Sequence, residues 1–104
     1  MSKQTKAPAK RARRGRYLAK VYVSLKPTVN DPEGLTIGGA LGSLGFEGVQ
    51  GVRSGRYFEV TLEAAGEAEA SALVEQMCAR LLANPVIEMY RFEVEAVVAA
   101  GAGS

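Results

Sequence analysis

The stretch from Glu67 to Val97 constrains the fold most, because it joins a helical pattern, a break and a long alternating pattern. Pro85 lacks a backbone N–H and disfavours helical geometry at Asn84, so we expect the helix to stop near Leu82 or Ala83. After this break, apolar and polar residues alternate, which predicts a strand with one buried face. The helix carries one apolar stripe, which needs a sheet to lie on: Leu73, Val74, Met77, Cys78, Leu81 and Leu82.

A strand and a short helix are predicted in the first part of the chain. Apolar and polar residues alternate from Tyr17 to Lys26, and Pro27 ends this strand. Asp31 and Pro32 then provide a helix cap and a proline suited to the first turn. The helix that follows is expected to end at Gly45, and its apolar stripe is formed by Ile37, Leu41 and Leu44.

Two more strands are predicted at Val49–Arg53 and Arg56–Ala64, joined by a tight turn at Ser54-Gly55. The element order is therefore β-α-β-β-α-β. This order predicts an α+β fold in which two helices cover one face of a four-stranded antiparallel sheet, the ferredoxin-like split β-α-β architecture. The other sheet face is expected to carry polar residues whose charges pair across strands: Lys20, Tyr22, Tyr57, Glu59, Thr61, Glu63, Arg91, Glu93 and Glu95.

The ends of the chain differ in composition from the predicted domain, which spans residues 17–98. Residues 1–16 contain seven Lys and Arg residues and no acid, whereas the remainder holds six basic and eleven acidic residues. The segment has no aromatic or branched aliphatic residue, so we interpret it as a disordered basic tail. Such a tail can bind nucleic acid, but without aromatic residues a solvated extension is favoured. Residues 99–104 are interpreted as a flexible C-terminal end.

The residue types that many enzymes need are missing from this sequence. It has no histidine and one cysteine, Cys78, which lies on the predicted core stripe. This excludes Ser-His, Cys-His and His-metal sites, and we expect the chain to have no active site and to bind no cofactor or metal of its own. The single cysteine, and the lack of any apolar run approaching about 20 residues, favour a cytoplasmic protein with no export signal and no membrane partner.

An RNA-binding role is the least favoured of the three functions that the sequence suggests. The segment 53–58, Arg-Ser-Gly-Arg-Tyr-Phe, faintly resembles the third-strand motif of an RNA-recognition domain, whose aromatic residues stack on bases. Four acidic residues would share that sheet face and repel phosphates, so nucleic acid is not an expected partner: Glu59, Glu63, Glu93 and Glu95.

Three stretches of the chain carry a more specific pattern. They are Lys20 to Pro27 running on to Asp31-Pro-Glu-Gly34, then Gly45-Phe46 with Val52 to Glu59, and finally Met77 to Glu88. Together they resemble the PurS family, the small subunit of phosphoribosylformylglycinamidine synthase. The resemblance covers residues 17–97 in register and with the same element order. The basic tail and the glycine-rich first helix depart from the family pattern.

The resemblance implies a non-catalytic role in de novo purine biosynthesis. In that family a large synthetase subunit, PurL, uses ATP and Mg²⁺ to activate formylglycinamide ribonucleotide, and a glutaminase subunit, PurQ, releases ammonia from glutamine. PurS, as a homodimer or tetramer, bridges the two enzymes of this glutamine-dependent ligase so that ammonia reaches the activated substrate. The implied partners are therefore PurL, PurQ and further copies of this chain, with ATP and Mg²⁺ bound by PurL.

Nine residues at predicted turns match the family pattern and are candidate interface residues: Lys26, Pro27, Asp31, Pro32, Arg53, Gly55, Asn84, Pro85 and Glu88. For five of them, Asp31, Pro32, Gly55, Asn84 and Pro85, a role as helix-cap or turn residues is favoured over a contact role, whereas Lys26, Arg53 and Glu88 are better candidates for contacts. The alternative function is a regulatory, small-ligand-binding module of ACT-like architecture. A ligand would then stabilise the chain without any protein partner.

Overall fold

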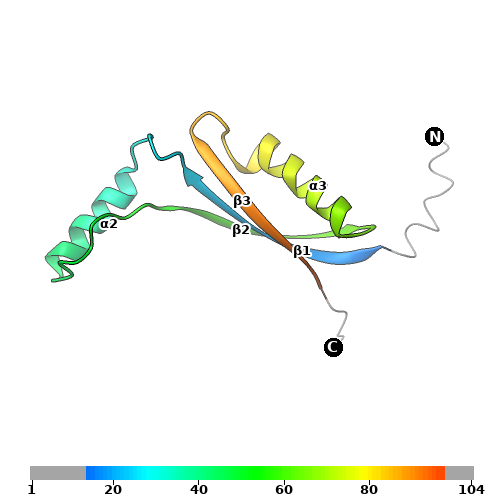
Figure 1. Ribbon diagram of the computed structural model, residues 1–104, viewed down its shortest axis with the longest axis horizontal. Helices are drawn as coiled ribbons and strands as arrows, with labels where there is room; N and C mark the ends of the chain where they lie inside the picture. The colour runs from blue at the N-terminus through cyan, green and yellow to red at the C-terminus, as the bar shows by residue number, and fades with distance from the viewer. Residues whose placement is uncertain (1–13, 98–104) are drawn as a thin grey trace.

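The computed structural model describes residues 14–97, which form one antiparallel sheet and its helices. β1 (Gly15–Leu25) lies at the centre of the sheet, between β2 (Gly55–Ala64) and β3 (Glu88–Ala96) (Figure 1). Tyr22 on β1 stands opposite Tyr57 on β2 and Arg91 on β3. The α+β class and the three alternating patterns that produce these strands are therefore confirmed.

α3 (Glu67–Met77) lies along one face of the sheet and continues into a π-helical turn, Cys78–Leu82. The helix thus ends where the Asn84-Pro85 break predicted. Between helix and sheet lies a core of small residues, buried to at least 95%: Ala19, Val21, Val23, Val74, Cys78 and Ala83. Apolar side chains of the outer strands pack against this core: Phe58, Val60, Leu62, Tyr90, Phe92 and Val94.

One member of the predicted helical stripe, Leu81, does not face the sheet. Leu81 is 82% exposed, whereas Val74 and Cys78 are fully buried, as predicted. The π-helical turn explains the difference, because the Ala83 N–H donates to the carbonyl of Cys78, five residues earlier, at 3.1 Å. The wider turn changes the rotation per residue and carries Leu81 away from the core.

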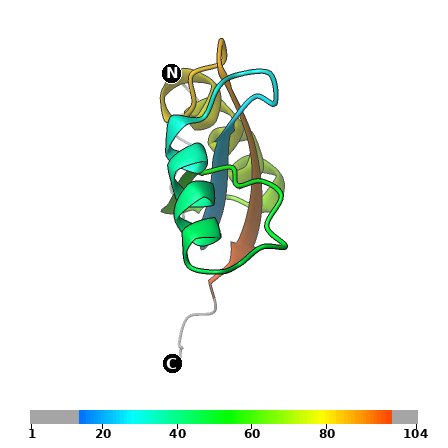
Figure 2. The ribbon, with the colours of Figure 1, turned by 90° about the vertical axis from the view of Figure 1, so that its left-hand side faces the viewer.

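The prediction of four strands with two helices on one face is wrong for the described residues. Val49–Arg53 forms no strand, and the sheet has three strands. α2 (Pro32–Ser43) projects away from the sheet, and the chain returns beside it, as Figures 1 and 2 show. We call residues 32–52 the arm. An extended segment becomes a strand only when a neighbour accepts its hydrogen bonds, and among the described residues no strand pairs with Val49–Arg53.

Both ends of α2 follow the sequence signals. The Asp31 carboxylate caps the first turn by accepting from the Gly34 N–H at 2.9 Å. At the other end Gly45 has a φ of 98°, and the N–H groups of Gly45 and Phe46 donate to the carbonyls of Gly42 and Leu41. This is the hydrogen-bond pattern of a Schellman motif, in which glycine takes the left-handed position.

The last two residues of the predicted basic tail lie in the sheet. Gly15 and Arg16 belong to β1, and Arg14 Nη2 donates to the carbonyl of Glu63 at 2.9 Å. The rest of the tail and the predicted C-terminal end, residues 99–104, lie outside the described residues. Within residues 14–97, no helix combines the length and apolarity that crossing a membrane requires.

The sheet face opposite α3 carries the predicted polar side chains. The Lys20 ammonium lies 3.6 Å from Glu95, and the Arg91 guanidinium lies 4.0 Å from the ring centroid of Tyr22. Tyr57 donates to Glu59 at 2.9 Å; desolvation of the phenol and this carboxylate raise the pKa of Tyr57 to about 12. The prediction that charges on this face pair across strands is confirmed for Lys20 and Glu95.

Candidate functional site

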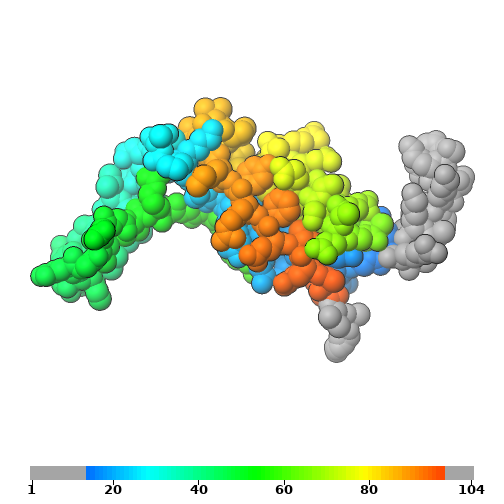
Figure 3. Space-filling view, viewed as in Figure 1, coloured from blue at the N-terminus to red at the C-terminus, as the bar shows by residue number. Residues whose placement is uncertain are grey.

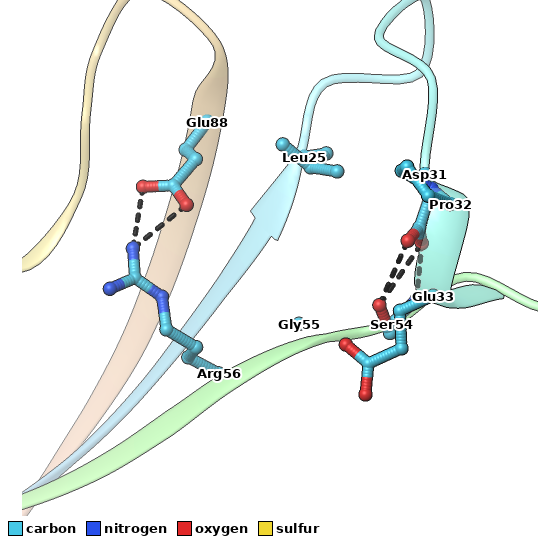
Figure 4. Close-up of a pocket in the computed structure, with 8 residues that line it drawn as sticks. All are labelled: Leu25, Asp31, Pro32, Glu33, Ser54, Gly55, Arg56 and Glu88. Atoms are coloured by element: carbon cyan, nitrogen blue, oxygen red, sulfur yellow. Dashed lines mark hydrogen bonds and ion pairs between the residues drawn. The ribbon is translucent and has the colours of Figure 1, made fainter.

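The candidate interface residues converge at one end of the sheet. Three connections meet there: 26–31 before α2, 52–54 after the arm, and 83–87 between the π-helical turn and β3. A cavity of about 380 Å³ opens between them (Figure 4), lined by Leu25, Asp31, Pro32, Glu33, Ser54, Gly55, Arg56 and Glu88. The structure therefore brings together residues that the sequence separates by more than 50 positions.

Asp31 joins the two connections of the arm. It is 97% buried, and its carboxylate accepts from the Gly34 N–H at 2.9 Å and from the Ser54 N–H at 2.6 Å. The Ser54 hydroxyl donates to the same carboxylate at 3.0 Å. The backbone N–H groups of Ser54 and Gly34 hold the pKa of the Asp31 carboxyl below its ordinary value. Asp31 is thus a structural clamp as well as a helix cap.

Arg53 fastens the arm from the opposite direction. Its Nη2 donates to the carbonyl of Lys26 at 3.0 Å and to that of Val29 at 2.9 Å. The Lys26 N–H donates to the carbonyl of Ile87 at 2.8 Å, which links this loop to the third connection. Arg53, predicted as a contact residue, therefore holds the loop that carries Lys26 and Pro27.

An ion pair between Arg56 and Glu88 closes the other side of the cavity. Arg56 Nη2 lies 2.7 and 2.8 Å from the two carboxylate oxygens of Glu88. Glu88 Oε1 also accepts from the Asn84 N–H at 2.7 Å. The Glu88 side chain is only 14% exposed and that of Arg56 is 53% exposed. Glu88, predicted as a contact residue, thus orients the start of β3 relative to β2.

Sequence reasoning missed Arg56, although the pattern of β2 contains its signal. Arg56 shares the period-two face of Phe58, and that face packs on the core. A charge at such a position lies beside apolar neighbours, so a partner of opposite charge from another element stabilises it. Its guanidinium lies 5.6 Å from the ring centroid of Phe58 and bonds Glu88. Ser54 was also missed, and its role depends on contact with Asp31.

The remaining candidates shape the backbone. Asn84 Oδ1 accepts from the Val86 N–H at 3.0 Å, and the Asn84 carbonyl accepts from the Glu88 N–H at 2.7 Å, so Asn84-Pro85 forms a tight turn. A Cβ atom on Gly55 would lie 2.3 Å from the carbonyl oxygen of Val23. A role in shaping turns therefore accounts for the local structure at Asn84, Pro85 and Gly55.

This end of the sheet can recognise a partner through its charge and shape. The acidic groups Asp31 and Glu88 accept hydrogen bonds from the chain itself. Cys78 lies in the core, where burial and the nearby Glu75 raise the pKa of its thiol and keep it protonated. Among residues 14–97 no three acidic, cysteine or histidine side chains gather as a metal site.

Known proteins place this arrangement in a family. The family model described as PurS: Phosphoribosylformylglycinamidine (FGAM) synthase matches residues 18–96. The chain belongs to the PurS family. It is 52% identical over 83 residues to subunit PurS of Bacillus subtilis, which covers 80% of this chain and 98% of the relative. It is 49% identical over 81 residues to subunit PurS of Synechocystis, covering 78% of this chain and 81% of the relative.

Solved PurS structures share the fold. The C2 crystal form of Bacillus subtilis PurS matches with a TM-score of 0.68 at 51% identity, covering 76% of this chain and 98% of that one. A structure of PurLQS from Thermotoga maritima matches with a TM-score of 0.69 at 30% identity, covering 79% and 98%. The PurS match spans every candidate interface residue.

Proposed function

We propose that this chain is the non-catalytic PurS subunit of a phosphoribosylformylglycinamidine synthase in de novo purine biosynthesis. It bridges a PurQ-type glutaminase and a PurL-type synthetase in the cytoplasm, as a homodimer or a tetramer. One observation carries the proposal: the alignment with Bacillus subtilis PurS covers 98% of that protein at 52% identity. The name PurLQS, given to the related structure from Thermotoga maritima, supports partners of the PurL and PurQ types.

The proposed mechanism is delivery rather than chemistry on this chain. The glutaminase releases ammonia, and the synthetase uses ATP and Mg²⁺ to activate the amide of formylglycinamide ribonucleotide. Ammonia then displaces phosphate from the activated amide and gives the amidine. A bridge that holds the two enzymes together raises the effective concentration of ammonia at the synthetase and limits its loss to water. The absence of histidine from the sequence agrees with such a role.

The end of the sheet that holds the cavity is the proposed contact surface for an enzyme partner. Asp31, Arg53 and Glu88 stabilise its three loops through the bonds described above. Pro27 and Pro32 are exposed beside them. Loops held by buried polar groups keep one shape, which lowers the entropy lost on binding. The alternatives of an ACT-like ligand module and an RNA-binding domain receive less support, because the family match favours a synthase subunit.

The two nitrogen sources test the proposed function. We expect the glutaminase and the synthetase to need this chain for glutamine-dependent formation of the amidine. High ammonium in place of glutamine should restore turnover without the chain, because free ammonia needs no bridge. Purified alone, the chain should hydrolyse neither glutamine nor ATP. Full glutamine-dependent turnover by the two enzymes without it would disprove the bridging role.

A charge reversal tests the proposed contact surface. Lys26→Glu changes a half-buried side chain at the cavity end of the sheet, whereas Lys20→Glu makes the same change on the open sheet face. We expect Lys26→Glu to weaken assembly with the enzymes about tenfold or more, and Lys20→Glu to leave it nearly unchanged. Equal loss in both variants, measured by analytical ultracentrifugation, would contradict this placement.

A further inference from the structure

The connection between the π-helical turn and β3 exposes three large apolar side chains. Leu81 at 82% and Val86 at 75% are the two most exposed large apolar residues in the described chain, residues 14–97, and Ile87 is 38% exposed. We call these three residues the apolar knob. Figure 3 shows the connection, in light orange, as a projection at the upper edge of the molecule. The knob presents roughly 300 Å² of apolar surface, and contiguous patches of that size often have a function.

The backbone beneath the knob is closed into one shape by bonds at both of its ends. Arg56 Nη2 donates to the Leu82 carbonyl at 3.4 Å and to the Glu88 carboxylate at 2.7 Å, so one guanidinium holds the start and the end of the turn. Within the turn, Asn84 Oδ1 accepts from the Val86 N–H at 3.0 Å. A turn that is ordered before binding loses little conformational entropy when a partner covers it.

The knob is continuous with the surface proposed above to contact an enzyme partner. The Lys26 N–H donates to the Ile87 carbonyl at 2.8 Å, so the loop that carries Lys26 lies against the knob. Glu88, which follows Ile87 in the chain, lines the cavity at the same end of the sheet. A partner that covers Lys26 is therefore positioned to cover Ile87 and Val86 as well.

Positive charge borders the knob. Arg80 is exposed and directly precedes Leu81. Neither Arg80 nor Lys26 forms an ion pair within residues 14–97, whereas the nearby acid Glu88 is already paired with Arg56. Carboxylates on an approaching surface would therefore meet cations that have no partner of their own, which favours an acidic border on that surface.

The shape of the knob indicates which class of molecule covers it. Sites for small molecules are concave, whereas the knob projects from the surface (Figure 3). A projection with apolar side chains fits a groove on another protein. Protein interfaces commonly combine an apolar centre with a polar rim, and the knob with its bordering cations has this composition.

We propose that Leu81, Val86 and Ile87 dock into an apolar groove, bordered by Asp or Glu side chains, on one enzyme subunit of the synthase. Leu81 and Val86 fill the groove, and Arg80 and Lys26 pair with the carboxylates at its border. This assignment rests on the proposed function and adds to it the chemistry of the surface that the partner must present.

Titration calorimetry of the full-length chain against the purified synthetase, the purified glutaminase and their mixture tests the assignment. Leu81→Asp and Val86→Asp should each raise the dissociation constant about tenfold or more, because each places a charge without a partner in the groove. Met89→Asp is the matched control, since Met89 is 47% exposed and lies close to the knob in sequence but lines a pocket with Tyr22 on the open sheet face. This control should bind like the wild type, and circular dichroism checks that each variant is folded.

Two further variants separate the apolar and the charged parts of the contact. Leu81→Ala removes apolar area without adding a charge and should give a smaller loss of affinity in the same direction. Arg80→Glu should raise the dissociation constant several-fold at low ionic strength, and its difference from the wild type should shrink as salt screens the charges.

The outcomes distinguish this assignment from the proposed function. Wild-type affinity in both knob variants, or an equal loss in Met89→Asp, would overturn the assignment and leave the proposed function intact. A change in the mass of the isolated chain in both knob variants, measured by analytical ultracentrifugation, would show that a second copy covers the knob and would also overturn it. A wild type that binds neither enzyme nor their mixture would refute the proposed function and this assignment together.

Discussion

Truncation of Val74 to alanine tests whether the small core between α3 and the sheet holds the domain together. Val74 is fully buried and belongs to a core of otherwise small side chains. The substitution removes the equivalent of two methylene groups, which is worth about 1.6 kcal/mol of transfer free energy. The cavity of roughly 40 Å³ that remains adds about 1 kcal/mol. We therefore expect Val74→Ala to lower the free energy of unfolding by about 2–3 kcal/mol.

Leu81→Ala is the control, because it removes more atoms from a neighbouring turn. Leu81 is 82% exposed, so its truncation should change the free energy of unfolding by less than about 0.5 kcal/mol. Urea denaturation followed by circular dichroism measures both variants at one fixed protein concentration, since an oligomer gains stability with concentration. The midpoint should fall for Val74→Ala while the slope stays constant.

The reasoning would be refuted by either of two results. A loss below about 1 kcal/mol in Val74→Ala would mean that this core contributes little to the stability of a domain of this size. A loss in Leu81→Ala as large as that in Val74→Ala would mean that the π-helical turn does not carry Leu81 out of the core.

Three further substitutions test the loops and the arm. Because the native pKa of Asp31 is depressed, the carboxylate contributes fully to the free energy of unfolding above its ordinary pKa of 3.8, and this contribution is lost as the pH falls through the native pKa. Asp31→Asn should therefore lower the melting temperature at pH 7, and the melting temperature of the variant should decline less steeply than that of the wild type below about pH 4. Gly34→Ala should destabilise the domain by about 1–3 kcal/mol in urea denaturation, because the new Cβ would lie 2.3 Å from the carbonyl of Val52; a gain in stability would contradict this contact. Pro85→Ala should cost about 0.4–1 kcal/mol through greater freedom of the unfolded chain, and calorimetry showing an unchanged melting temperature would count against a role for this joint.

Local signals in the sequence determined most of the element boundaries. Asp31 caps α2, Gly45 ends it, and Pro85 separates the helical segment from β3, all as predicted. These signals depend on the sterics and hydrogen bonds of residues within a few positions of one another, so they act in the same way wherever the segment lies. The alternation in β1 likewise identified its buried face, Ala19, Val21 and Val23.

The candidate site was predictable in its location but not in its bonds. The nine turn residues named from the sequence do lie around one end of the sheet, because the connections from β1 to α2, from the arm to β2 and from the π-helical turn to β3 all lie at that end. The pairs that organise the site join distant positions: Asp31 with Ser54, and Arg56 with Glu88. A side chain's partner depends on the register between strands, and no local pattern encodes that distance.

Only the tertiary structure decided where the arm lies. The apolar stripe of α2 and the alternation at Val49–Arg53 are what a helix and a strand packed on their own sheet would show. Such patterns state that a face will be buried, but not which surface buries it. Here Asp31 and Arg53 hold the arm away from the sheet, so Leu44 and Phe46 stay exposed and the segment before Ser54 has no neighbouring strand. The sequence alone determined both helices and three of the four predicted strands. Long-range contacts determined which elements share a core, because burial depends on the whole chain rather than on any segment of it.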